Sequence, residues 1–131
     1  MKLILKKFKE PVIILISFIL YIFNQKIYRP QVLSNIESNR YLVFILGVIP
    51  NFLGAIMTFL TCLFLLKLQN KQSLGKIINF SFLTTLTLVI FMELERFINQ
   101  NIKFDVFDIL ASILALITCL ICYKKEIEFY N

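Results

Sequence analysis

Hydrophobic stretches without charge alternate along the chain with shorter charged ones. Four windows contain no Asp, Glu, Lys or Arg: 11–25, 41–66, 77–92 and 109–123. They cover 72 of the 131 residues, so all 22 charged residues lie in the other 59. Because a helix that crosses a bilayer needs about 20 mostly apolar residues, we predict an all-α, polytopic membrane protein, a single domain built as a bundle of four transmembrane helices. The expected spans are approximately 8–25, 50–67, 76–94 and 105–123.

The second window is longer than one span and contains Pro50, Asn51 and Gly54. Proline fits the first turn of a helix but disrupts its interior. We therefore predict two pieces, a short apolar segment over 41–49 and a spanning helix that begins at the Pro50–Asn51 break. The alternative is one long, tilted helix with a kink at Pro50.

The amino-acid composition excludes several kinds of catalytic and binding site. Hydrophobic residues make up 59% of the chain and histidine is absent, which excludes His-based catalysis and His metal sites. The three glycines form no phosphate-binding loop. The net charge is +6, but the basic residues flank the apolar windows, as suits anionic lipid headgroups better than nucleic acid. We expect the lipid bilayer as a partner, no nucleic acid, no metal and no cofactor.

Two of the windows carry small or hydroxylated residues at helical spacing. In the third window these are Ser81, Thr84, Thr85 and Thr87, and in the fourth they are Ala111, Ala115, Thr118, Cys119 and Cys122. Small faces let membrane helices approach closely, and hydroxyls bond across helices or to the carbonyl four residues earlier. We interpret both sets, including the Cys119-x-x-Cys122 pair, as packing features.

The distribution of basic residues predicts the orientation. The N-terminal segment, the 67–76 loop and the C-terminal tail together hold nine Lys and Arg, and the 26–40 and 93–108 loops hold five. Since basic loops stay in the cytoplasm, both termini are predicted to be cytoplasmic.

With this orientation, polar residues gather at the outer ends of three helices: Asn51, Glu93, Asp105 and Asp108. Part of this set has a structural interpretation, because Asp105 fits an N-cap with Asp108 three residues on, and Arg96 could pair with Glu93 one turn away. The functional hypothesis is that the four residues converge in an outward-facing polar pocket that binds a ligand. No nucleophile and base are paired, so we do not expect hydrolysis, and an enzymatic role has no residue-level support.

The same residues carry a resemblance to the VanZ-like membrane protein family, named after a teicoplanin-resistance protein. Val48–Ala55 is similar to the family's Pro-(Asn/Asp)-Phe-Leu helix entry, and Glu93 is followed twelve positions later by an Asp-x-x-Asp pair, Asp105 and Asp108. Arg96 stands where the family has Gln, and Ser112 replaces its Asn. The family's nearby glycine and the Gly-Arg of its short loop are missing here as well. The resemblance implies a multi-pass protein of the bacterial cytoplasmic (inner) membrane, tied to the cell envelope or to glycopeptide antibiotic resistance, without implying a reaction.

Three functions follow as hypotheses. The first is binding of an envelope lipid or cell-wall precursor headgroup at the outer face, contributing to glycopeptide tolerance. The second is a small membrane transporter, although Pro11–Gln25 lacks the membrane-embedded acid that such exporters carry in their first helix. The third is a structural subunit that joins a membrane complex, or forms an oligomer, through the small-residue faces.

Overall fold

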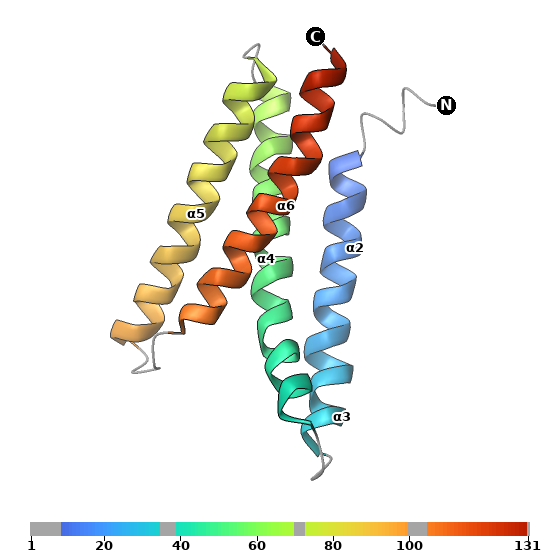
Figure 1. The fold of residues 1–131 in the computed structure, drawn as a ribbon, viewed down its shortest axis with the longest axis vertical. Helices are drawn as coiled ribbons and strands as arrows, with labels where there is room; N and C mark the ends of the chain where they lie inside the picture. Colours follow the sequence, from blue (N-terminus) through green and yellow to red (C-terminus); the bar gives the residue numbers. More distant parts are fainter. Residues whose placement is uncertain (1–8, 35–38, 70–72, 100–104, 131) are drawn as a thin grey trace.

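The structure is a computed structural model that describes residues 9–34, 39–69, 73–99 and 105–130, with side chains up to Tyr123. It confirms the all-α, four-helix architecture (Figure 1). The elements are α2 (Lys9–Phe23), the π-helical turn η1 (Asn24–Tyr28), α3 (Arg29–Ser34), α4 (Arg40–Gln69), α5 (Leu74–Asn99) and α6 (Val106–Tyr130). The first three form one helical segment, Lys9–Ser34, and each of the four long segments is long and apolar enough to cross a membrane.

Helix α4 lies at the centre and packs against α2, α5 and α6, while α5 also packs against α6. The beginning of α2 and the end of α6 lie at the same end of the bundle (Figure 1). The opposite end is formed by α3, the beginning of α4, the end of α5 and the beginning of α6. This second end is where the predicted site residues lie.

The predicted break at Pro50 is wrong, because α4 is continuous from Arg40 to Gln69 with Pro50 inside it. Proline has no backbone N–H, so the carbonyl four residues earlier, that of Leu46, loses its helical donor. The side-chain Nδ2 of Asn24, 3.2 Å away on η1, donates to this carbonyl. A donor from the neighbouring helix thus replaces the missing one, which is how proline is tolerated in membrane helices.

The helices also extend beyond the predicted spans, most clearly in the first, which was expected to end at 25 and continues to Ser34. Hydropathy identifies only the part of a helix that is apolar enough for the lipid interior. The backbone hydrogen bonds of the helix continue beyond that part, so the helices are longer than the predicted spans. The extension contains the π turn, in which the N–H of Arg29 bonds to the carbonyl of Asn24. Pro30 follows directly, and the wider turn accommodates a residue that would clash with the preceding turn of a regular α-helix.

The core lies toward the end of the bundle where α2 begins and joins α4, α5 and α6. Its buried members are Phe59, Leu60, Leu63, Ile77, Ile78, Leu116, Cys119 and Tyr123. The small-residue face of α6 is confirmed for Ala111, Ala115 and Cys119, which are buried, whereas Thr118 and Cys122 are exposed. The predicted back-bonding is confirmed as well, because Ser81, Thr85 and Thr87 each donate to the carbonyl four residues earlier.

Candidate functional site

A pocket with a volume of about 580 Å³ opens between the helices at the α3 end of the bundle. All four residues singled out from the sequence, Asn51, Glu93, Asp105 and Asp108, line it. They come from α4, from the end of α5, and from the beginning of α6. A volume in the range of roughly 300–1,000 Å³ is typical of small-ligand sites. The sequence thus located residues that the fold brings together, although whether they bind a ligand stays a prediction.

Arg96 of α5 connects two of the acids. Its Nη1 lies 2.7 Å from Oε1 of Glu93 and 3.4 Å from Oδ2 of Asp108 on α6. The first contact confirms the predicted pairing at a spacing of three. The Glu93 and Asp108 side chains are only 8% and 13% exposed, so their charges depend on this guanidinium for compensation. Arg96 therefore lies between two acidic side chains that come from different helices.

Asp105 has the structural role that its position predicts. Its Oδ1 accepts a hydrogen bond of 2.9 Å from the N–H of Phe107, the second residue of α6. This is the N-cap arrangement. The side chain is also exposed at the edge of the pocket, so Asp105 caps the helix and adds a third carboxylate to the same site.

Ser112 holds α6 against α4 beneath the acids. Its Oγ lies 3.0 Å from the carbonyl of Asp108 and 3.4 Å from that of Asn51. The residue is buried, and the backbones of α4 and α6 are close enough for one small side chain to reach both. Its hydroxyl therefore serves in packing, because its hydrogen-bond partners among the described residues are these two backbone carbonyls and not a base.

The other side of the pocket comes from a part of the chain that was not among the predicted site residues. Tyr21, Gln25 and Arg29 recur every four residues from α2 to α3 and line the pocket. The helical spacing of three polar residues at the end of an apolar window could have indicated this face. Apolar side chains complete the lining, among them Val48 and Met92.

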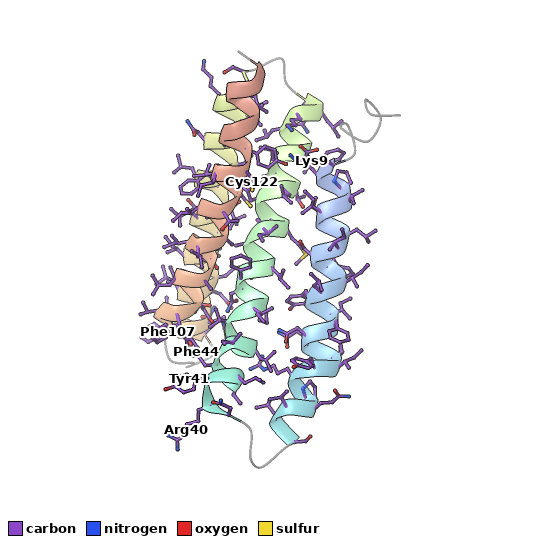
Figure 2. All side chains as sticks on the ribbon, turned by 45° about the vertical axis from the view of Figure 1, so that its right-hand side comes forward. Lys9, Arg40, Tyr41, Phe44, Phe107 and Cys122 are labelled. Atoms are coloured by element: carbon purple, nitrogen blue, oxygen red, sulfur yellow. The ribbon has the colours of Figure 1, made fainter. Side chains whose placement is uncertain are left out.

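Two aromatic rings connect α4 and α6 at the same end. Phe44 and Phe107 meet edge to face with ring centroids 5.1 Å apart (Figure 2). Phe44 also lines the pocket, whereas Tyr41, one turn earlier on α4, is largely exposed. The site therefore combines charged groups, amides and aromatic surface.

A second polar cluster, not predicted from the sequence, lies at the opposite end of the bundle. Glu10, 3% exposed, forms an ion pair with Lys67 of α4 and accepts a hydrogen bond of 3.2 Å from the hydroxyl of Tyr123 on α6. The ammonium of Lys9 lies 4.6 Å from the centre of the Tyr123 ring. These contacts join the beginning of α2 to two other helices. From the sequence, Lys67 contributes only to the basic charge of the 67–76 loop, because no local signal indicates a partner 57 positions away.

Within the described part of the chain, no group of three His, Cys, Asp or Glu side chains is placed to hold a metal ion. At the pocket, the space between Glu93 and Asp108 is occupied by the guanidinium of Arg96. What the site offers chemically is a set of hydrogen-bond acceptors, amide groups and two arginines. These groups can hold and orient a polar ligand.

Comparisons with models of known protein families, with curated proteins and with solved structures found no match to this chain. The VanZ-like resemblance therefore rests on the short motifs around Pro50 and Glu93.

Proposed function

We propose that this chain is a VanZ-like protein of the bacterial cytoplasmic membrane that binds the headgroup of an envelope lipid or lipid-linked cell-wall precursor in the pocket. The observation that carries the proposal is the composition of the pocket. Charged and amide side chains share it with apolar ones at the end of a bundle of membrane-length helices. A ligand with a polar head and an apolar body requires that combination.

The charged side chains of the pocket are better explained by ligand binding than by a purely structural role in the bilayer. Ionisable side chains in membrane segments are costly and mark ligand or ion pathways by default. Here Glu93, Arg96 and Asp108 are partly compensated by one another, yet all three line the pocket. A headgroup would complete their hydrogen bonding. With both termini in the cytoplasm, the pocket would face the outer leaflet, where precursors of the cell wall are used.

The test measures binding and abundance separately. The full chain is purified in detergent, and lipid binding is measured by native mass spectrometry against the phospholipids of a bacterial membrane. Asp108→Asn should lower binding, because the substitution removes a charge from the pocket while keeping the size of the side chain. Glu95→Gln is the matched control, since Glu95 lies on α5 outside the pocket and bonds to Asn99.

In cells, the same two variants distinguish a role in ligand binding from a role in folding. We expect Asp108→Asn to raise glycopeptide susceptibility at unchanged protein abundance, and Glu95→Gln to leave both unchanged. Equal lipid binding by Asp108→Asn, Glu95→Gln and the parent chain would contradict the proposal. A loss of abundance that parallels the loss of phenotype would assign Asp108 to helix packing instead.

A further inference from the structure

Charges of opposite sign line different sides of the pocket. The α5–α6 side carries the carboxylates of Glu93, Asp105 and Asp108 around Arg96, and the α2–α3 side carries Arg29. At this end of the bundle, α3 and the α5–α6 pair lie on different sides of α4 (Figure 1). The pocket therefore has an acidic side and a basic side, with α4 residues between them.

The acidic side keeps a negative character despite Arg96. This side has three carboxylates and one guanidinium, and among the described residues Arg96 forms ion pairs with Glu93 and Asp108 but not with Asp105. The carboxylate of Asp105 accepts the cap hydrogen bond through Oδ1, and the residue is exposed at the pocket. This side can accept several hydrogen bonds from a cationic donor.

The basic side offers one guanidinium. Arg29 is half-buried at the beginning of α3, and within the residues the structure describes it forms no ion pair. Gln25 and Tyr21, one and two turns earlier, line the pocket beside it. A planar guanidinium is the group that best matches a phosphate, through two parallel hydrogen bonds.

From this separation of charge we infer that the ligand is a zwitterion, a phosphate next to a primary ammonium, as in an ethanolamine phospholipid. The inference deepens the proposed function and rests on it. The phosphate lies toward Arg29, and the ammonium donates its three hydrogens toward the carboxylates of the α5–α6 side. The apolar side chains of Val48, Leu88 and Met92 face the acyl portion, which favours a lipid over a soluble zwitterion.

The test compares ligands that differ in one group. The detergent-purified full chain is titrated with phosphatidylethanolamine, with its N-trimethylated choline analogue, with phosphatidylglycerol, and with soluble glycerophosphoethanolamine, and bound ligand is read by native mass spectrometry. Binding should be strongest for phosphatidylethanolamine. The choline analogue keeps the charge but has no N–H donors, and phosphatidylglycerol has no cation. Charged hydrogen bonds contribute enough for each loss to weaken binding about tenfold.

Two pairs of variants test the two sides. Asp105→Asn keeps the helix cap, because Asn caps as well as Asp, and removes a charge from the acidic side. It should reduce the preference for phosphatidylethanolamine over phosphatidylglycerol, whereas Glu95→Gln should not. Arg29→Gln should weaken all the phosphate ligands about tenfold, whereas Arg40→Gln, an exposed arginine outside the pocket (Figure 2), should weaken none.

The outcomes separate the inference from the proposed function. If phosphatidylglycerol binds as well as phosphatidylethanolamine while Arg29→Gln weakens both, the pocket binds a headgroup but not a zwitterion, and the inference is overturned alone. If Arg29→Gln, Arg40→Gln and the parent chain all bind every lipid equally, both the inference and headgroup binding at this pocket are overturned. Comparable binding of glycerophosphoethanolamine supports the zwitterion and identifies the source as a soluble molecule.

Discussion

The hydrogen bond from Asn24 to the carbonyl of Leu46 makes a quantitative prediction about Pro50. Asn24 is 5% exposed and Leu46 is 4% exposed, and the Nδ2–O distance is 3.2 Å. Asn24→Leu keeps a branched side chain but leaves the carbonyl without a donor. An unsatisfied buried group costs about 1–3 kcal/mol, and hydrogen bonds inside a membrane protein average about 0.6 kcal/mol with a maximum near 1.7. Because the Oδ1 atom of Asn24 is itself unpaired, its removal offsets part of the cost, and we expect a loss of about 1 kcal/mol in the free energy of unfolding.

Pro50→Ala should remove the contribution that the Asn24 amide makes to the free energy of unfolding. Alanine supplies the backbone N–H that proline lacks, so the carbonyl of Leu46 regains its helical donor. In the Pro50→Ala background, Asn24→Leu should therefore cost close to nothing. The double-mutant cycle should give a coupling energy of about 1 kcal/mol between two residues that lie on different helices, which exceeds the deviation from additivity of about 0.3–0.5 kcal/mol seen for independent sites.

The assay is reversible unfolding in mixed micelles, with SDS as the denaturant and far-UV circular dichroism as the signal. Thr118→Val serves as the control, because the Thr118 hydroxyl bonds to the carbonyl of Leu114 within its own helix and should not couple to Pro50. If the costs of Asn24→Leu and Pro50→Ala add, or if Thr118→Val couples equally, then Asn24 does not replace the donor that Pro50 lacks, and the reasoning fails.

Three further substitutions test other contacts by the same unfolding measurement. Asp105→Ala should cost about 0.5–2 kcal/mol through loss of the cap while Asp105→Asn stays close to the parent, and equal losses would assign the effect to charge. Glu10→Gln should cost about 1–3 kcal/mol, because Lys67 loses its carboxylate, and parental stability would mean that Lys67 rehydrates freely. Ala115→Leu should cost about 1–3 kcal/mol by overpacking the fully buried α6 face, with Ile117→Leu, on an exposed position, unchanged; if the two variants unfold alike, the face is not tightly packed.

Several contacts of the candidate site could be predicted from residues that are close in sequence. The caps and the spacing of three depend only on residues close in sequence, so Asp105 as a cap and Glu93 paired with Arg96 could both be predicted from the chain, and both are confirmed. The contact between Arg96 and Asp108 joins two helices, and the lining by Arg29 depends on the packing of α3 against α4. Neither follows from spacing along one helix.

The charge-free windows were enough to predict the number and type of the long helices. A segment in lipid must satisfy its backbone hydrogen bonds internally, so a charge-free window of sufficient length becomes a helix whatever its neighbours are. Hydropathy did not determine which face of each helix lies inside, because lipid and protein interior are equally apolar. In α2 most of the large apolar side chains are exposed, and only Ile13 and Ile14 pack against the core. The buried residues of the first helical segment, Glu10, Ser17 and Asn24, are polar and spaced by seven.

The roles of those polar residues depend on how the helices pack together. Glu10 is compensated by Lys67 and by Tyr123, which lies 113 positions later, and Asn24 donates to a carbonyl that Pro50 left without a partner. In both cases a group that would be unfavourable alone is satisfied by another helix. The local cost of Pro50 predicted a break, and the donor that removes this cost comes from a residue that becomes its neighbour only when the bundle forms.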